Sequence, residues 1–244
     1  FGTFLGIPDP ATFMGDASYV RTRWSAHPDA ALVAEIEGKV VGSNFAANWG
    51  SVGFFGPLTV RPDMWDKGIA KHLLGPTMSL FEKWGTRHTC LFTFAQSPKH
   101  IGLYQKFGFW PRFLTAIMSK SVSPSIPKLK WSMYSEAANH AECLDACRSL
   151  TDNVYRGLDL EWEIESVNKQ GLGDTILLWD NDGTLRGLAV CHCGAGSEAG
   201  SGVCYVKFGA VDPGPDAGQR FDYLLDACEA FASSRGIGRL DAGV

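Results

Sequence analysis

The fold is decided at one junction, which reads Val60-Arg61-Pro62-Asp63-Met64-Trp65-Asp66-Lys67-Gly68-Ile69-Ala70. An apolar strand is predicted to end at Val60, and a helix is predicted to begin near Lys67. A strand that runs through a glycine loop into a helix presents free backbone N–H groups at the positive end of the helix dipole. Such a junction suits a pyrophosphate. The loop alone is equally compatible with an ordinary strand-to-helix turn.

The spacing of apolar residues on either side of this junction predicts a mixed α/β unit. Strands are expected where apolar and β-branched residues cluster between turn signals, and helices where apolar residues recur at helical spacing. Ser97 stands as a helix N-cap, Pro98 as the first helical residue and Gly108 as the stop. The predicted elements are strands at 31–37, 39–48 and 52–60, a helix at 67–84, a strand at 89–94, a helix at 98–107, and one or two strands within 109–120.

The same pattern occurs a second time in the chain. Val60 and Val211, Pro62 and Pro213, Leu74 and Leu225, and Gly85 and Gly236 are each separated by 151 residues. An ordered set of matches at one separation indicates an internal repeat. The second copy is predicted to contain strands at 175–180, 184–193 and 203–211, a helix at 221–234 and a last strand that ends at Val244.

The repeat predicts two domains, at 1–120 and 131–244. Residues 121–130 form the linker, because they are rich in proline and serine and have no helical or strand period. The second copy stops before any counterpart of the helix that follows Ser97, and the first copy is short at its start. Both copies therefore look clipped at a chain end, and the first residue is Phe1 rather than Met.

Composition excludes several classes of protein. The 244 residues are 45% apolar and 20% charged, and no run reaches the roughly 20 apolar residues of a membrane helix. A formal net charge of −4 argues against a general nucleic-acid binder, and no secretory leader is present. Cys191-His192-Cys193 invites a metal interpretation, but its two thiols share one strand face and no second ligand pair supports it. We expect seven reduced, buried thiols, no metal and a cytoplasmic protein.

A second motif, Leu103-Tyr104-Gln105-Lys106-Phe107-Gly108-Phe109, ends the helix that follows the next strand. Together with the loop at 65–70, it resembles the GNAT family, the acetyl-CoA-dependent N-acetyltransferases. The family's Gln/Arg-x-x-Gly-x-Gly/Ala loop falls on Trp65 to Ala70, and its Asn-x-x-Ala-x-x-Leu-Tyr-x-x-x-Gly-Phe motif falls on Ser97 to Phe109. The resemblance covers most of 29–120 and, in weaker form, 150–244, so it implies an α/β mixed-sheet fold of two tandem GNAT units.

The resemblance implies a role for each matching residue. Backbone groups of Leu58, Thr59 and Val60 would pair with the pantetheine arm of acetyl-CoA. Ser97 would lie near the cofactor, and Tyr104 would protonate the leaving thiolate. A bulge at Gly56-Pro57 would separate the third strand from its neighbour and make room for the cofactor. The pyrophosphate would be held by the N–H groups of Asp66, Lys67, Gly68, Ile69 and Ala70.

Several residues depart from the family pattern. Trp65 replaces the usual Gln or Arg, Ser97 replaces the usual Asn, and the third strand at 52–60 contains no carboxylate. An amine must lose its proton before it attacks a thioester. The base is not identified, and the candidates nearest in sequence are Glu35, Glu37, His88 and His100. The loop of the second copy is more degenerate, and this copy lacks a counterpart of Tyr104, so it does not form a complete site.

Two functional hypotheses follow. The first is an enzyme that transfers acetyl from acetyl-CoA to a small-molecule or protein amine by direct attack, with no nucleic-acid or membrane partner. The second is a non-catalytic acyl-CoA-binding or scaffolding protein that kept the fold. A third possibility is an unrelated α/β domain. The dense aromatic residues of the first copy are interpreted as core rather than as a substrate box: Phe54, Phe55, Phe92, Phe94, Phe107, Phe109, Trp110 and Phe113.

Overall fold

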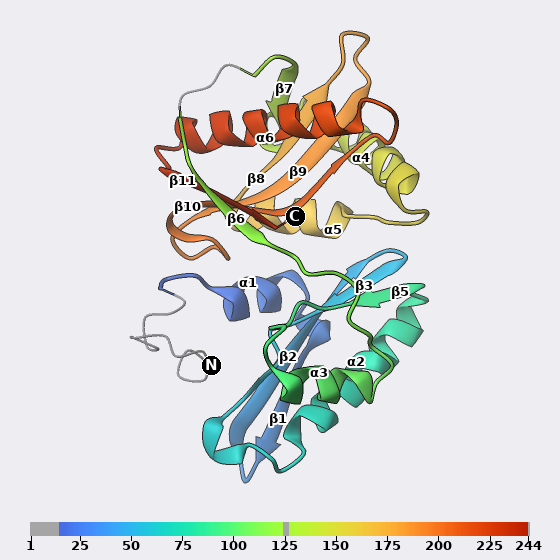
Figure 1. Cartoon of the computed structure of the whole chain (residues 1–244), viewed down its shortest axis with the longest axis vertical. Coiled ribbons are helices and arrows are strands. Elements are labelled where there is room, and N and C mark those ends of the chain that lie inside the picture. The colour runs from blue at the N-terminus through green and yellow to red at the C-terminus, as the bar shows by residue number, and fades with distance from the viewer. Residues whose placement is uncertain (1–14, 124–126, 244) are drawn as a thin grey trace.

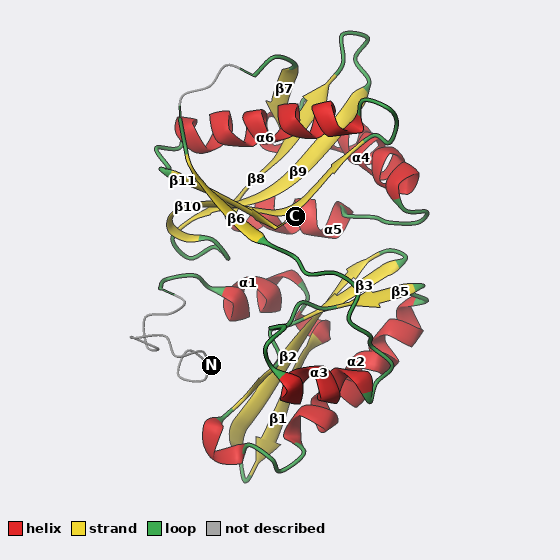
Figure 2. Cartoon of the chain, viewed as in Figure 1, coloured by secondary structure: helices red, strands yellow, loops and turns green. Residues whose placement is uncertain are grey.

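The computed structural model describes residues 15–123 and 127–243. The chain forms two α/β units, each built around its own mixed sheet, and helix α1 lies between the two sheets (Figure 1). Both units combine helices and strands in one compact layer arrangement (Figure 2). The predicted α/β class with two units is confirmed.

The first unit contains a five-stranded sheet. Its order is β1-β2-β3-β5, and β4 pairs with β2 beside that path. β1 and β2 form an antiparallel hairpin, whereas β3 and β5 run parallel. The elements are α1 (Tyr19–Ala26), β1 (Ala31–Ile36), β2 (Lys39–Trp49), β3 (Val52–Phe55), β4 (Thr59–Val60), α2 (Ile69–Trp84), β5 (His88–Cys90) and α3 (Pro98–Gln105), with short 3₁₀ helices at Pro28–Ala30 and Pro62–Met64.

The second unit contains a six-stranded sheet in the order β6-β11-β10-β9-β8-β7. One face packs against α6 and the other against α4 and α5, so that this sheet is buried on both sides. The elements are β6 (Ile117–Ser121), β7 (Lys130–Met133), a 3₁₀ helix (Tyr134–Glu136), α4 (His140–Val154), α5 (Glu161–Gln170), β8 (Gly173–Trp179), β9 (Leu185–Gly194), β10 (Gly200–Val211), α6 (Ala217–Ser234) and β11 (Arg239–Gly243).

The two units repeat one order of elements. In each, an antiparallel hairpin turns at a glycine with positive φ, Gly38 at 74° and Gly183 at 82°. A third strand and a helix follow, and the next strand lies parallel to the third. The two helices end beside Gly85 and Gly236, which also have positive φ. The repeat read from the sequence thus corresponds to a repeated arrangement in space.

Strand β6 corrects the prediction that 109–120 closes the first copy. It lies at the edge of the second sheet, antiparallel to β11, with Ser121 opposite Arg239. The edge of β11 carries backbone groups that need partners, and β6 supplies them. Lys120 Nζ also contacts the buried carboxylate of Glu229 at 2.5 Å. We propose that the boundary between the units falls before β6 rather than at residue 120.

Other predictions need smaller corrections. β5 ends at Cys90, short of the predicted Phe94, and α4 and α5 have no predicted counterpart. The core interpretation is wrong for Phe92, Trp110 and Phe113, whose exposed fractions are 71%, 68% and 90%. All three lie in segments without regular structure, which no other element covers.

The cysteines are free thiols, as expected, and five of the seven are buried. Cys90 is exposed, which differs from the prediction. Cys191 packs into the core beneath α6, whereas His192 faces the opposite side of the sheet, toward the first unit. No helix within residues 15–123 and 127–243 is long and apolar enough to cross a membrane.

Candidate active site

The third strand of the first sheet is broken at Gly56-Pro57. β3 ends at Phe55 and is paired with β5 as far as Phe54 and Cys90. The chain then continues as β4, which pairs with β2 and not with β5. The peptide bond between Gly56 and Pro57 is cis. The expected separation of the third strand from its neighbour is therefore present, and one edge of β4 faces away from the sheet.

The residues that follow β4 form a loop whose backbone N–H groups point to an open space. Gly68 is the N-cap of α2 and has φ of 79°. Its carbonyl accepts from the N–H groups of Lys71 and His72, while no acceptor within the described chain is recorded for the N–H groups of Gly68, Ile69 and Ala70. A Cβ at Gly68 would meet nothing within 4 Å. This arrangement fits a bound phosphate group.

Trp65, the departure from the family motif, holds this loop against β4. Its indole Nε1–H donates to the carbonyl of Val60 at 2.9 Å. The ammonium of Lys99 lies 5.8 Å from the centre of the Trp65 ring and 2.6 Å from the Asp66 carboxylate. Lys99 belongs to the first turn of α3, so the loop and α3 meet on the same side of the unit. The charge of Asp66 is thereby balanced close to the anion cradle.

Ser97 occupies the predicted N-cap position of α3, but its side chain does not cap the helix. The residue is fully buried, and its hydroxyl pairs with Nδ1 of His100 at 2.5 Å. Burial and the nearby Lys99 charge lower the pKa of His100. Ser97 and His100 therefore form a fixed neutral pair at the start of α3.

Tyr104 packs beside the strand break. Its ring contacts Phe55, the last residue of β3, with ring centres 5.8 Å apart. Both residues belong to the core between the sheet and its helices. Burial raises the pKa of Tyr104 to about 12. The hydroxyl thus keeps its proton at neutral pH and remains a hydrogen-bond donor.

The other candidate bases lie elsewhere. Glu35 and Glu37 are exposed at the β1–β2 hairpin. His88 stacks on Tyr155 of the second unit, with ring centres 4.9 Å apart. The structure brings none of these three next to Tyr104.

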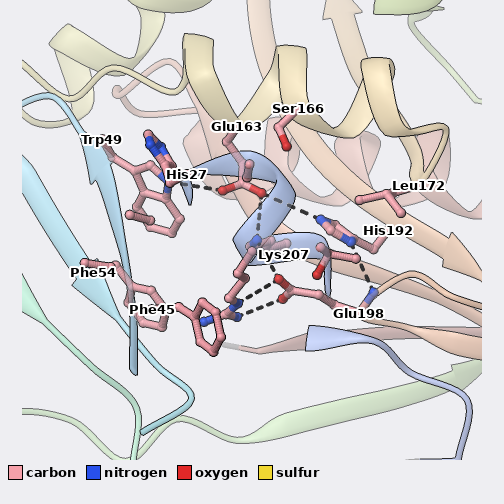
Figure 3. Close-up of a pocket in the computed structure, with 15 residues that line it drawn as sticks. His27, Phe45, Trp49, Phe54, Glu163, Ser166, Leu172, His192, Glu198 and Lys207 are labelled. Atoms are coloured by element: carbon pink, nitrogen blue, oxygen red, sulfur yellow. Dashed lines mark hydrogen bonds and ion pairs between the residues drawn. The ribbon is translucent and has the colours of Figure 1, made fainter. Parts of the chain in front are cut away.

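A buried cluster of charges between the units has no counterpart in the sequence predictions (Figure 3). Arg23 forms a two-pronged ion pair with Glu198, with both N–O distances at 2.8 Å. Lys207 Nζ lies between Glu163 and Glu198, at 2.6 and 2.9 Å from their oxygens. His192 accepts from the Glu198 N–H at 3.3 Å. These residues come from α1, α5, β9, the loop after β9 and β10, so no local spacing reveals them.

The cluster fixes the charge state of its carboxylates. Burial alone would raise the pKa of Glu163, but Lys207 and His192 outweigh that effect and the pKa falls to about 2. Burial acts on Glu198 in the same way, and Lys207 and Arg23 hold its pKa well below the usual range. Both glutamates are therefore ionised and paired at neutral pH.

Acid is expected to destabilise the chain between about pH 5 and pH 2, since the usual Glu pKa near 4.3 applies to the unfolded state. A lowered folded pKa adds stability above the unfolded value, and this stability is lost as pH falls through the folded value of about 2. For Glu163 the contribution is on the order of 3 kcal/mol. Urea unfolding at pH 7, 5 and 3.5 measures it.

Two variants test this account of acid sensitivity. Glu163→Gln should be less stable than the wild type at pH 7 but should lose less stability on acidification. Glu165→Gln is the matched control on the same helix, because Glu165 pairs with Lys169 at the surface. It should keep the wild-type dependence on pH. Equal pH slopes for the wild type and Glu163→Gln would contradict the assignment.

The fold and the broken third strand define the first unit as an acyltransferase-like α/β domain. Residues 6–109 match the family model of the acetyltransferase (GNAT) family, so the chain carries a domain of that family. No curated protein sequence matches the chain. The recognition made from the two sequence motifs is confirmed.

Solved structures share the fold across both units. A putative acetyltransferase from Pyrococcus horikoshii is 14% identical with a TM-score of 0.58, and the match covers 91% of this chain and 66% of that one. A probable N-acyltransferase from Enterococcus faecalis is 11% identical with a TM-score of 0.53, covering 91% and 57%. A GCN5-related N-acetyltransferase from Sphaerobacter thermophilus is 13% identical with a TM-score of 0.51, covering 85% and 69%. The chain thus spans about two thirds or less of the length of the first two.

Proposed function

We propose that the first unit is an acetyl-CoA-dependent N-acetyltransferase. The observation that carries the proposal is the juxtaposition of the broken third strand, the open N-terminus of α2 and the Tyr104 ring beside Phe55. A long thioester with a pyrophosphate needs an extended strand edge, an anion cradle and a donor near sulfur, and this unit offers all three in chain order.

Each part has a distinct task in this proposal. The free edge of Leu58, Thr59 and Val60 binds the pantetheine arm as an added strand. The N–H groups from Asp66 to Ala70 hold the pyrophosphate, and Ser97 with His100 shapes the wall nearby. These contacts fix the thioester at the gap beside Gly56, so that the acetyl carbon is oriented before the amine arrives.

Tyr104 then manages the proton at sulfur. As the amine nitrogen forms a bond to the acetyl carbon and the carbon–sulfur bond breaks, negative charge develops on sulfur. Tyr104 donates its proton to that sulfur, and the amine proton leaves to a base or to water. A pKa of about 12 keeps the Tyr104 proton in place until that moment. The acceptor is a small-molecule or protein amine, and the free thiols fit the reducing cytoplasm.

A second candidate is a non-catalytic acyl-CoA-binding protein. The specific observation in its favour is that 52–60 holds no carboxylate to act as a base. The two candidates predict the same binding but different turnover.

Turnover distinguishes them directly. The full chain is incubated with acetyl-CoA and a panel of primary amines and lysine peptides, and both free CoA and acetylated amine are quantified by chromatography with mass detection. Release of CoA in step with an acetylated amine supports the enzyme. Tight binding of acetyl-CoA without any acetylated product across the panel supports the second candidate.

A further inference from the structure

Arg23 joins the strand break of the first unit to the second unit. One of its guanidinium nitrogens donates to the carbonyl of Gly56 at 2.5 Å. The other two donate to both carboxylate oxygens of Glu198 at 2.8 Å. The guanidinium also lies 5.4 Å from the centre of the Phe54 ring. Three directions of the side chain are thus fixed at once.

Glu198 is held in turn by the second unit. It is 2% exposed, it accepts from Lys207 Nζ at 2.9 Å, and its own N–H donates to His192 at 3.3 Å. Lys207 is anchored to Glu163 on α5 (Figure 3). The orientation of Arg23 is therefore set by residues of the second sheet and its helix.

The Gly56 carbonyl is the first backbone group after the third strand leaves β5. The Gly56 N–H donates to the Phe45 carbonyl at 2.8 Å, so the sheet holds one side of this peptide and Arg23 holds the other. Neighbouring strand residues face opposite sides. Phe54 lies with Arg23, and Phe55 lies with Tyr104. The break is thus clamped on the face opposite Tyr104.

We propose that Glu198 and Arg23 are positioning residues: through them the second unit sets the geometry of the strand break at which the first unit binds the thioester. The catalytic consequence rests on the proposed function, whereas the mechanical link to Gly56 does not. Buried ion pairs add little net stability compared with apolar packing, so a geometric role accounts for charges at this interface. A second unit without a complete site of its own then still contributes to acetyl transfer.

The test uses the full chain with Arg23→Lys. Lysine keeps the charge beside Glu198, but its single ammonium lacks the planar fork that reaches Gly56 and both Glu198 oxygens together. Trp162→Phe is the matched control, because Trp162 Nε1 donates across the same interface to the Ala26 carbonyl at 2.7 Å without touching the break. Glu198→Gln is the second variant, and thermal unfolding confirms that each protein is folded.

The first readout is hydrogen–deuterium exchange of peptides that cover 56–60. Arg23→Lys and Glu198→Gln should accelerate exchange there by roughly tenfold or more, whereas Trp162→Phe should leave it within about twofold. Equal exchange in all four folded proteins would overturn the proposal, and so would equal acceleration in Trp162→Phe. This readout needs no ligand.

The second readout is the affinity for acetyl-CoA. We expect Arg23→Lys to weaken binding by roughly tenfold and Trp162→Phe by less than about twofold, because only Arg23 reaches the break. If the wild type binds and Arg23→Lys binds equally well, the positioning role fails and the proposed function stands. If the wild type does not bind, the proposed function fails, and the exchange data still decide whether the second unit holds Gly56.

Discussion

Gly68→Glu is expected to weaken the binding of acetyl-CoA by roughly 100-fold or more, since a carboxylate then stands where the pyrophosphate needs donors. The three N–H groups of Gly68, Ile69 and Ala70 have no recorded acceptor in the described chain, and the space at the Gly68 Cβ is open. The new side chain therefore projects into the anion cradle itself. Calorimetric titration of the purified variant measures the loss.

Gly85→Glu is the matched control for this prediction. Gly85 caps the other end of the same helix, has φ of 69° and also has open space at its Cβ. Both substitutions carry the cost of a left-handed residue, about 1–2 kcal/mol. Gly85→Glu should bind acetyl-CoA within about twofold of the wild type. Equal losses in both variants would show that backbone strain, and not the cradle, governs binding.

Tyr104→Phe is expected to lower kcat by roughly 100-fold while the dissociation constant for acetyl-CoA changes by less than about threefold. The substitution removes only the hydroxyl and keeps the ring contact with Phe55. Since burial raises the pKa of Tyr104 to about 12, the wild-type rate should show no alkaline loss from this residue below about pH 11. Rate profiles from pH 6 to 10 for both proteins test this point.

Tyr134→Phe is the control for loss of a buried tyrosine hydroxyl. Tyr134 lies in the core of the second unit and stacks on His140, with ring centres 4.5 Å apart. Its variant should keep the wild-type kcat. An unchanged kcat in Tyr104→Phe would remove the acid role and leave Tyr104 as a packing residue.

The local features of the first unit were predictable from sequence because they depend on neighbouring residues. Gly68 marks the loop-to-helix junction through its conformation, and Gly56-Pro57 marks the strand break because proline has no N–H for the ladder. The repeat at a separation of 151 residues predicted the second sheet before any of its contacts were known. These signals are short-range or periodic, so they survive in a single sequence.

Long-range choices were not predictable. Residues 117–121 have strand character, but nothing local says which of two sheet edges they join, and β11 supplies the partner. The charge cluster is equally silent, since Arg23 and Glu198 are 175 residues apart and meet only when the units pack. Ser97 shows a third limit: its place at the start of α3 was clear, but His100 claims its hydroxyl.

The account rests most directly on one measurement, the calorimetric titration of the folded wild-type chain with acetyl-CoA. It predicts a single site per chain with a dissociation constant in the range of about 1–100 μM, because only the first unit offers a strand break, an anion cradle and Tyr104 together. Absence of binding to the folded chain, or a second equivalent site, would contradict the assignment of acetyl-CoA binding to the first unit.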